Sequence, residues 1–525
     1  MTDQFWFQPL TPLSFLERSA RVFGDRTAVI DGDDRFTYRQ LADRSRRLAG
    51  GLAAAGVSPG DRVAVLAPNT HLLLEAHYGV PWSGGVLVAL NTRLHPQEMA
   101  YIVSHSGAAV LVADSAFAAA AGEIAATVPR PLQVVVAGGG DDGYEAMLAA
   151  ATPLARGVED ERDLISLNYT SGTTGRPKGV MYHHRGAYLQ SLAMAFHGGL
   201  DAGSGFLWTL PMFHCNGWCF TWAVTAAGAT HICLRSVEPA SIWKMIRTGD
   251  VTHFNAAPTV LTMLAHHEGA EEGPAPRPVR VGTGGAPPSP TLLEEMAALN
   301  MDVTHLYGLT ETFGPITLCE WRPEWDELPI ADQARIKARQ GVGNVISDRM
   351  RVVDASGADV PADAATLGEV ALTGNNVMQG YFRDEEATTR AVPDGWFRTG
   401  DLAVMHPDGY VELKDRAKDI IISGGENIAS IEVEQAIVSH AAVSEAAVVG
   451  APHPKWGEAP VAFVDLKPGR PLTAEEVTAH VRSRLAGFKA PRAVVFGPLP
   501  KTSTGKVQKY VLRGRAEDVF RDLSG

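Results

Sequence analysis

The chain of 525 residues is predicted to adopt an α/β fold: a large N-terminal domain with mostly parallel sheets, then a small α+β domain. Three observations lead to this prediction. Short apolar runs typical of buried strands alternate with helical segments from residue 62 to residue 308. The chain is longer than the roughly 250–300 residues at which a single core stops growing. Near Arg416 the sequence changes to a compact mixture of helices and strands.

The N-terminal part begins with a helix whose ends are marked. Thr37 and Gln40 form a capping box at its start, and Gly56 can end it. Four buried strands follow, with spacings that leave room for intervening helices and so favour a parallel sheet. We expect these strands at 62–68, 85–90, 108–114 and 132–138.

A second α/β run follows, and its last two strands end in glycine-rich turns. Ligands bind beyond the carboxyl ends of strands in open α/β sheets, so these turns are candidate walls of a site. The expected strands are 231–236, 253–258, 279–285 and 303–308.

The expected C-terminal domain covers residues 416–525, which leaves 1–415 for the N-terminal domain. Its pattern begins with a helix at 431–438, followed by strands at 443–450 and 461–466. A capping box formed by Thr473 and Glu476 opens another helix, which we expect to close near Gly487.

Composition and charge exclude several classes of protein. The net charge of −13 argues against nucleic-acid binding, which needs a basic face. No apolar run approaches the ~20 residues of a membrane span, and the N-terminus lacks a signal-peptide pattern. The C-terminal residues RDLSG are not a peroxisomal address. The four cysteines form no CxxC pair, so we expect reduced thiols in a cytoplasmic protein rather than a cysteine metal site.

The segment YTSGTTGRPKGV, from Tyr169 to Val180, combines glycines with hydroxyl side chains. Gly175 is followed by Arg176 rather than Lys, so the Walker A pattern is not met. Glycines let backbone N–H groups approach an anion, and a lysine adds a point charge. The segment predicts a phosphate-binding loop, with a plain glycine-rich hairpin as the alternative. The candidate ligand-binding residues are Thr170, Ser171, Gly172, Thr173, Thr174, Gly175 and Lys178.

Four further segments carry chemically suggestive residues. HLYGLTET, residues 305–312, places the Glu311 carboxylate, a hard ligand suited to Mg²⁺, beside the hydroxyl of Thr310. GTGGAPPS, residues 282–289, offers a loop open to close backbone approach. The others are GWFRTGDLAVMHPDGYVELKDRAKDIIISGGENIASIEVE, residues 395–434, and PKTSTGKVQK, residues 500–509.

Together, and in their order along the chain, the five segments resemble the acyl-adenylate-forming superfamily over nearly the whole chain. The resemblance implies that Lys506, Thr310, Glu311 and His214 are catalytic and that Glu311 holds Mg²⁺. It implies that Lys418 is the hinge of a mobile C-terminal domain. Besides the residues of the phosphate loop, it places Gly284, Gly285, Ala286, His305, Tyr307, Gly308, Asp401 and Arg416 around AMP, and Ser423, Gly424 and Gly425 along a CoA tunnel.

The acid pocket is expected in LPMFHCNGWCFTWAV, residues 210–224. His214 stands at the family's pocket position, and Trp218 and Trp222 follow it at helical spacing. The expected pocket residues are His214, Trp218, Gly285 and Gly308. Two indoles argue against a wide tunnel, which favours a short- or medium-chain or an aromatic acid.

The resemblance implies a ligase that uses ATP, Mg²⁺ and CoA in two steps, through an acyl-AMP intermediate. An enzyme that loads a carrier-protein thiol is the main alternative. An oxidative luciferase-like enzyme and an idle nucleotide-binding regulator are further alternatives. The acid and the oligomeric state are open, a homodimer being one option.

Overall fold

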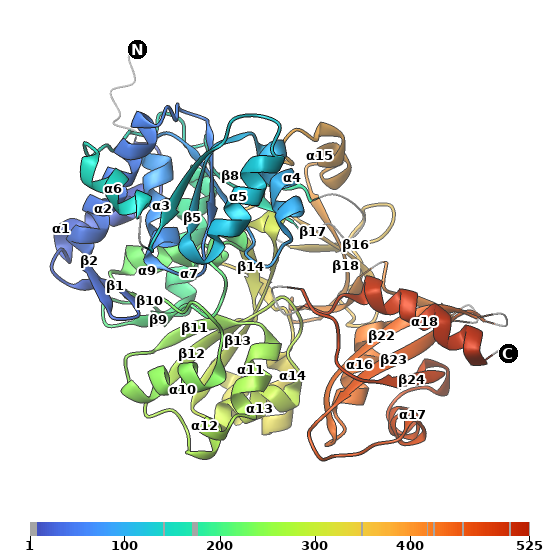
Figure 1. The fold of residues 1–525 in the computed structure, drawn as a ribbon. Helices are drawn as coiled ribbons and strands as arrows, with labels where there is room; N and C mark the ends of the chain where they lie inside the picture. The colour runs from blue at the N-terminus through green and yellow to red at the C-terminus, as the bar shows by residue number, and fades with distance from the viewer. Residues whose placement is uncertain are drawn as a thin grey trace, which may run out of the picture.

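The computed structural model describes residues 8–523 except 140–141, 171–176, 348–349, 417, 424–425, 454–455 and 503–505. Figure 1 shows three sheets in the N-terminal part and a separate smaller unit at the C-terminal end. The predicted α/β fold, with a large N-terminal domain and a smaller C-terminal one, is confirmed.

The first large sheet contains six strands in the order β6-β5-β3-β4-β7-β8. All its pairs are parallel except β7 with β8, which are antiparallel. The four strands expected from the sequence are present within a few residues of their predicted ends. The strands are β3 (Arg62–Leu66), β4 (Val86–Ala89), β5 (Ala108–Asp114), β6 (Gln133–Ala137), β7 (Leu164–Tyr169) and β8 (Gly179–His183).

The one helix predicted in this part of the chain begins and ends where the sequence indicates. Thr37 and Gln40 form the predicted capping box at the start of α2 (Tyr38–Ala54). Gly56 follows the helix with a φ of 91°, a backbone conformation that favours glycine. The other helices are α1 (Leu13–Val22), α3 (His71–Trp82), α4 (Pro96–Ser106), α5 (Ala118–Thr127), α6 (Gly143–Ala150) and α7 (His184–Gly198).

The second large sheet contains nine strands in the order β15-β14-β13-β12-β11-β9-β10-β1-β2. It is parallel from β13 to β1 and antiparallel at both edges. Its strands are β1 (Thr27–Asp31), β2 (Asp34–Thr37), β9 (Gly205–Leu207), β10 (Thr230–Ile232), β11 (His253–Ala256), β12 (Val279–Thr283), β13 (Met301–Leu309), β14 (Gly314–Leu318) and β15 (Val342–Gly343). Its helices include α9 (Phe220–Ala227), α10 (Pro239–Thr248), α11 (Pro258–Ala265), α13 (Pro290–Ala298) and α14 (Ile330–Lys337).

A four-stranded antiparallel sheet, which the sequence analysis did not predict, lies between the large sheets and the C-terminal unit in the chain. Its strand β18 lacks the clean alternation of buried and exposed residues that marks a half-buried strand. The strands are β16 (Arg351–Val353), β17 (Gly368–Leu372), β18 (Phe397–Met405) and β19 (Val411–Arg416).

The C-terminal unit has its own sheet and its own apolar clusters. The helix opened by Thr473 ends at Arg482, which is earlier than the expected end near Gly487. Its strands are β20 (Ile421–Ser423), β21 (Glu426–Ile428), β22 (Val443–His453), β23 (Gly457–Leu466) and β24 (Ala493–Phe496). Its helices are α16 (Ser430–Val438), α17 (Ala474–Arg482) and α18 (Lys509–Leu523).

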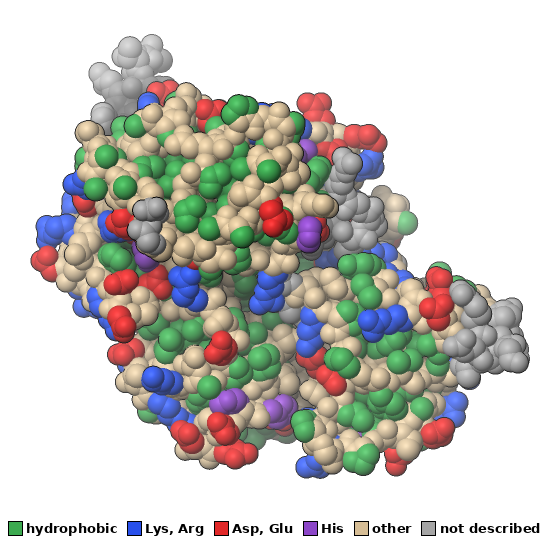
Figure 2. Space-filling model, viewed as in Figure 1, with side chains coloured by type: hydrophobic (Ala, Val, Ile, Leu, Met, Phe, Trp, Pro, Cys, Tyr) green, Lys and Arg blue, Asp and Glu red, His purple; other side chains and the backbone are tan. Residues whose placement is uncertain are grey.

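The surface carries charges of both signs. Figure 2 shows Lys and Arg side chains interspersed with Asp and Glu over the face in view. On this face the two signs are mixed and no single basic patch is visible. Within the described parts of the chain, no helix is long and apolar enough to cross a membrane.

Candidate active site

The predicted motifs meet where strands of the two large sheets end. The parallel strands β11, β12 and β13 bring their carboxyl ends to one edge of the nine-stranded sheet. On the neighbouring sheet, the Tyr182 hydroxyl of β8 donates to the Thr310 carbonyl at 2.6 Å. The carboxyl-end edge expected to carry the site is therefore joined directly to the strand that follows the phosphate loop.

The phosphate loop connects the antiparallel strands β7 and β8. The Thr170 amide donates to the Lys178 carbonyl at 3.0 Å, which closes the neck of the loop. Its ends thus have the hairpin connection that was considered as the alternative, and this geometry is compatible with an anion held within the loop. The predicted residues Ser171, Gly172, Thr173, Thr174 and Gly175 lie outside the described residues.

Lys178 and Glu311 lie on either side of one aromatic residue, Tyr381. The Lys178 Nζ is 4.7 Å from the centroid of the Tyr381 ring, and the Tyr381 hydroxyl donates to Glu311 Oε1 at 2.8 Å. Burial, and then the Glu311 charge, raise the pKa of Tyr381, so its hydroxyl stays protonated and keeps donating. Tyr381 therefore fixes the carboxylate expected to meet Mg²⁺.

Sequence reasoning missed Tyr381. A bridge to Val180 places it beside β8, and the Thr388 hydroxyl accepts from its amide at 2.9 Å. The available signal was Gly380, immediately before it, which has a φ of 145° that side chains rarely adopt. A glycine-aromatic pair is too common to indicate a site by itself.

Thr310 and His214 lie on either side of Cys215, in the part of the site where the acid pocket is expected. This part is called the acid side below. The Cys215 thiol donates to Thr310 Oγ1 at 3.4 Å, and its sulfur lies 3.7 Å from His214 Nε2. Burial raises the pKa of Cys215 to about 12, so it is a neutral thiol and a poor nucleophile. Burial, and then the charge of Lys506, lower the pKa of His214 to about 4, so its imidazole is neutral at pH 7.

Asp401 lies in the antiparallel sheet opposite Arg416. The two residues are register partners on β18 and β19, and Arg416 Nε lies 3.0 Å from Asp401 Oδ1. The other oxygen, Oδ2, accepts from the Tyr307 hydroxyl at 2.7 Å. Three residues predicted from two separate motifs thus form one cluster at the end of β13, with Asp401 and Tyr307 buried and Arg416 half-buried.

Lys506, from the C-terminal unit, interacts electrostatically with Asp401 and Arg416 of this cluster. Its amide donates to Thr502 Oγ1 at 3.1 Å, and its carbonyl accepts from the Thr502 amide at 2.7 Å. The enclosing protein, and then the charge of Arg416, lower the pKa of Lys506 to about 8, while Asp401 opposes the change. The side chain is exposed to solvent, although the protein around it still penalises its charge. One cation therefore acts on both Asp401 and His214.

Lys418, the expected hinge residue, is contacted by the last helix. Arg513 of α18 donates to the Lys418 carbonyl at 3.2 Å and pairs with Asp419. Desolvation, and then repulsion by Arg416, lower the pKa of Lys418. Of the expected CoA-tunnel residues, Ser423 is buried at the end of β20, and Gly424 and Gly425 lie outside the described residues.

His305 lies inside the sheet with its ring against backbone carbonyls. Its Nδ1 lies 2.9 Å from the Ala338 carbonyl, and the Arg339 backbone also contacts the ring. Burial lowers the pKa of His305 to about 4, so it is neutral. These contacts account for the histidine structurally, and its contact with adenine stays a prediction.

The glycines of the adenine-side loop differ in what surrounds them. Gly285 has a φ of 84° and open space where a side chain would stand, and Ala286 beside it is exposed. A Cβ at Gly284 would lie 2.7 Å from the Leu306 carbonyl oxygen. A Cβ at Gly308 would lie 1.9 Å from the Gly314 carbonyl oxygen, so the packing of β14 alone requires glycine at that position.

The segment after His214 is not the right-handed helix that its spacing indicated, so the predicted helical spacing of the tryptophans is wrong. All five residues from Cys215 to Cys219 have φ values between 44° and 63°. A left-handed turn costs roughly 1–2 kcal/mol for each residue that is not glycine, so the surroundings must hold it. Trp222 lies in the right-handed α9 beyond the turn and is fully buried in the core.

Trp218 is turned toward the loop after β12. A Cβ at Gly284 would lie 3.0 Å from Trp218 Cη2, and a Cβ at Gly314 would lie 2.9 Å from Trp218 Cα. The residue is 7% exposed. The indole therefore spans the space between the start of β14 and the adenine-side loop, next to His214 in the chain.

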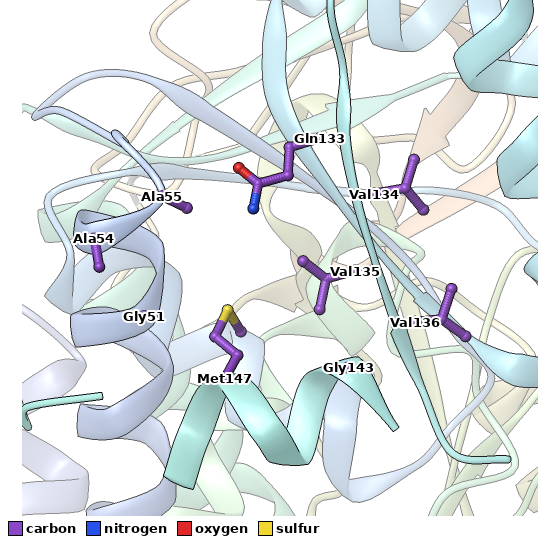
Figure 3. Close-up of a pocket in the computed structure, with 9 residues that line it drawn as sticks. All are labelled: Gly51, Ala54, Ala55, Gln133, Val134, Val135, Val136, Gly143 and Met147. Atoms are coloured by element: carbon purple, nitrogen blue, oxygen red, sulfur yellow. The ribbon is translucent and has the colours of Figure 1, made fainter. Parts of the chain in front are cut away.

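A groove of substantial volume lies elsewhere in the molecule. Figure 3 shows it between α2, the edge strand β6 and α6, with mostly apolar side chains around it. Its volume is about 570 Å³, and none of the predicted site residues lines it. The groove therefore does not compete with the strand-end cluster as the place of the chemistry.

Comparison with known proteins identifies the family of the chain. The model of the AMP-binding enzyme family matches residues 16–382, and that of its C-terminal domain matches residues 432–506. The acetate–CoA ligase of Humulus lupulus is 45% identical over 98% of this chain and 96% of its own length. The peroxisomal benzoate–CoA ligase of Arabidopsis thaliana is 41% identical over 97% and 93%. The ATP-bound structure of MatB from Rhodopseudomonas palustris is 28% identical, covers 97% of this chain and 99% of its own, and has a TM-score of 0.84. The chain belongs to the AMP-binding enzyme family.

Proposed function

We propose that the protein is an ATP-dependent acid–CoA ligase that works through an acyl-AMP intermediate. The observation that carries this proposal is the place of Lys506, which acts electrostatically on both Asp401 and His214. A cation between a ribose-binding carboxylate and an acid pocket can neutralise the two anions that must meet, the substrate carboxylate and the α-phosphate.

The nucleotide would lie along the strand-end edge. Asp401 and Arg416 bind the ribose hydroxyls, and the loop from Thr170 to Lys178 binds the β- and γ-phosphates. Tyr307, His305 and the loop 284–286 surround adenine. An ionised carboxylate makes strong hydrogen bonds to a diol, which supports the role of Asp401.

The residues present fit a magnesium ion held mainly by the nucleotide. The described residues contain no group of three or more His, Cys, Asp and Glu side chains that could hold a metal. Mg²⁺ commonly binds through one or two carboxylates together with substrate phosphates, so Glu311 with Thr310 beside it is sufficient. The ion would supply charge neutralisation to the phosphates, and Tyr381 keeps the Glu311 carboxylate oriented.

In the first step, a substrate carboxylate oxygen forms a bond to the α-phosphorus, and the bond to pyrophosphate breaks. Lys506 and Thr310 stabilise the charge, and His214 helps to position the acid. Since Cys215 is a neutral buried thiol, the chain needs no nucleophile of its own. In the second step, the CoA sulfur attacks the acyl carbon and AMP leaves.

The second step requires Lys506 to withdraw. We propose that residues 416–525 rotate about Lys418, with residues 1–415 fixed, and bring Ser423, Gly424 and Gly425 to the CoA path. The hinge already carries mutually repelling cations, Arg416, Lys418 and Lys506, whose repulsion an anionic nucleotide would relieve.

We propose a short-chain monocarboxylic acid as the substrate, because Trp218 closes the space beside Gly284. His214, Trp218 and Gly285 would line the pocket, and Gly308 would stand at its edge. The relatives named for acetate and for benzoate support a small acid and leave a compact aromatic acid as the second candidate.

The test is a panel of acids from acetate to palmitate, with benzoate and cinnamate, scored by AMP release with and without CoA. We expect CoA-dependent release with acetate to butyrate. Acid-dependent pyrophosphate exchange without CoA-dependent release would instead favour a carrier-protein thiol as acceptor. No exchange with any acid would refute the proposal.

A homodimer and a cytoplasmic location are further proposals. Several relatives are named as peroxisomal, so location needs its own measurement, by fractionation of cells that express the full chain. Sedimentation equilibrium would determine the oligomeric state.

A further inference from the structure

The left-handed turn Cys215–Cys219 is held by a buried hydrogen-bond network centred on Asn216. The Asn216 side chain is fully buried, and its Oδ1 accepts from the Ser166 hydroxyl and from Asn168 Nδ2, each at 2.6 Å. Its Nδ2 lies 3.0 Å from His77 Nε2. Its backbone amide donates to Asn168 Oδ1 at 3.1 Å. Every polar group of this side chain therefore has a partner on another element.

The state of His77 makes the network directional. The His77 Nδ1 lies 2.7 Å from the Leu73 carbonyl and must carry a proton to donate to it. Burial lowers the pKa of His77 to about 4, so the ring is neutral and its Nε2 is an acceptor. That acceptor matches the amide N–H of Asn216. A carboxylate at position 216 would oppose it with a second acceptor.

The residue types in the turn explain why an anchor is needed. Asparagine is one of the few residues, after glycine, that tolerates left-handed backbone. Gly217 also fits for lack of space, since a Cβ there would lie 2.6 Å from Trp208 Cζ3. Cys215, Trp218 and Cys219 have no such preference, and they adopt φ values of 48°, 56° and 63°. The turn is thus imposed by its surroundings, of which Asn216 makes the most side-chain hydrogen bonds.

The network connects the two substrate sides of the site. Ser166 and Asn168 belong to β7, the strand that leads into the phosphate loop. Two residues after Asn216, the Trp218 indole stands against Gly284. A shift of the turn would therefore move the indole relative to the strand that positions the nucleotide.

We propose that Asn216 is a positioning residue for acid selection: it anchors the Cys215–Cys219 turn to β7 and α3, and so fixes Trp218 as the end wall of the acid pocket. Asn216 acts through Trp218 and touches no substrate. This inference rests on the proposed function, because it assumes that the space beside Trp218 receives the acid.

The test compares kcat/KM for acetate and for hexanoate in the full-length protein and its variants, with the KM for ATP measured alongside. Asn216→Gly removes the side-chain bonds but still permits a left-handed backbone. We expect the acetate-to-hexanoate ratio to fall at least tenfold in this variant, with the KM for ATP within twofold of wild type. Ser166→Ala removes one of the bonds, and its ratio should fall about threefold.

The matched control is Asn376→Ala. Asn376 is a fully buried asparagine that donates to Gln190 and Ser347 and has no bond to the turn. Its ratio should equal that of wild type, even if its thermal midpoint drops. Comparing Asn376→Ala with Asn216→Gly therefore distinguishes a general loss of stability from a shift of Trp218.

An equal loss of kcat/KM for both acids in Asn216→Gly, with an unchanged ratio, would overturn the inference. If that variant does not fold, an unchanged ratio in Ser166→Ala overturns it equally well. Wild-type protein that activates neither acid would instead count against the proposed function, so the two failures are distinguishable.

Discussion

The two sides of the candidate site are held together by different forces. On the acid side, neutral buried groups such as Asn216, Ser166 and His77 form a closed hydrogen-bond network inside the N-terminal part. On the lysine side, Lys506, Lys418 and Arg416 repel one another in an open cleft. A satisfied buried network specifies one geometry, whereas exposed charges are screened and easily rearranged. This difference supports the proposal that substrate selection depends on the acid side and the timing of the two steps on the lysine side.

Lys506→Ala tests the difference between the acid side and the lysine side most directly. We expect acyl-AMP formation to fall by about 10²–10³-fold, as for loss of a preorganised group that stabilises developing charge. Thioester formation from supplied acyl-AMP should change little, because that step requires the lysine to be away. Pyrophosphate exchange measures the first step, and single-turnover thioester formation measures the second.

The matched control for this variant is Lys501→Ala. Lys501 lies in the same loop region and pairs with Glu445, 2.6 Å away, outside the cluster. It should retain both half-reactions. Equal losses in both half-reactions of Lys506→Ala would contradict the assigned timing role.

Much of the fold and part of the candidate site could be predicted from the sequence, for reasons that differ between regions. The parallel strands followed from apolar runs such as 62–68, because buried strands need continuous hydrophobic residues. The sheet β16–β19 could not be predicted, since β18 has no clear alternation. The pairing of Asp401 with Arg416 is a consequence of that sheet's register and was accessible only as a family resemblance.

The left-handed turn shows a different limit. Spacing arguments assume a right-handed helix, and they placed Trp218 and Trp222 on one face. The actual backbone is set by partners distant in sequence, Ser166, Asn168 and His77, so no local propensity could reveal it. Asn-Gly at 216–217 tolerates positive φ, but these two residues do not indicate a left-handed turn that also includes Cys215, Trp218 and Cys219.

A second prediction uses the pH dependence of the lysine side. The pKa of Lys506 is lowered to about 8, so the ammonium is charged below that pH and lost above it. The charged groups acting on it are Arg416, Asp401, Lys418 and Asp419. We expect kcat/KM for adenylation to be flat below about pH 7 and to fall roughly tenfold per unit above pH 8.

The rate of the second half-reaction, thioester formation, should rise with pH rather than fall. A free cysteine thiol has a pKa of about 8.5, and we expect the CoA thiol to behave similarly. The fraction of CoA present as the reactive thiolate therefore rises over the same pH range.

Lys506→Arg keeps its charge at high pH. That variant should therefore be slower than wild type but lose the alkaline fall. An alkaline fall that persists in it would assign the titration to another group.

A third prediction concerns a contact across the hinge. Asp415, at the end of β19, accepts from the amide of Ser430, the first residue of α16 in the C-terminal unit. Loss of such a cap costs about 1 kcal/mol, or roughly fivefold in an equilibrium. We expect Asp415→Ala to slow adenylation roughly fivefold and to leave thioester formation unchanged or faster. Stopped-flow single turnovers would measure both half-reactions. A slower thioester step would mean that the contact persists after rotation.

The smallest effect is expected from the acid wall itself. Trp218→Leu removes indole atoms that face Gly284, so the pocket should accommodate one or more additional methylene groups. Each buried methylene contributes about 0.8 kcal/mol, which is roughly fourfold in kcat/KM per added carbon. A series from acetate to hexanoate should therefore shift its optimum toward longer acids. Trp243→Leu is the matched control, because Trp243 is a buried tryptophan in a separate apolar cluster. If both variants keep the wild-type optimum, Trp218 does not limit the pocket, and acid length must be set by residues on the lysine side of the cleft.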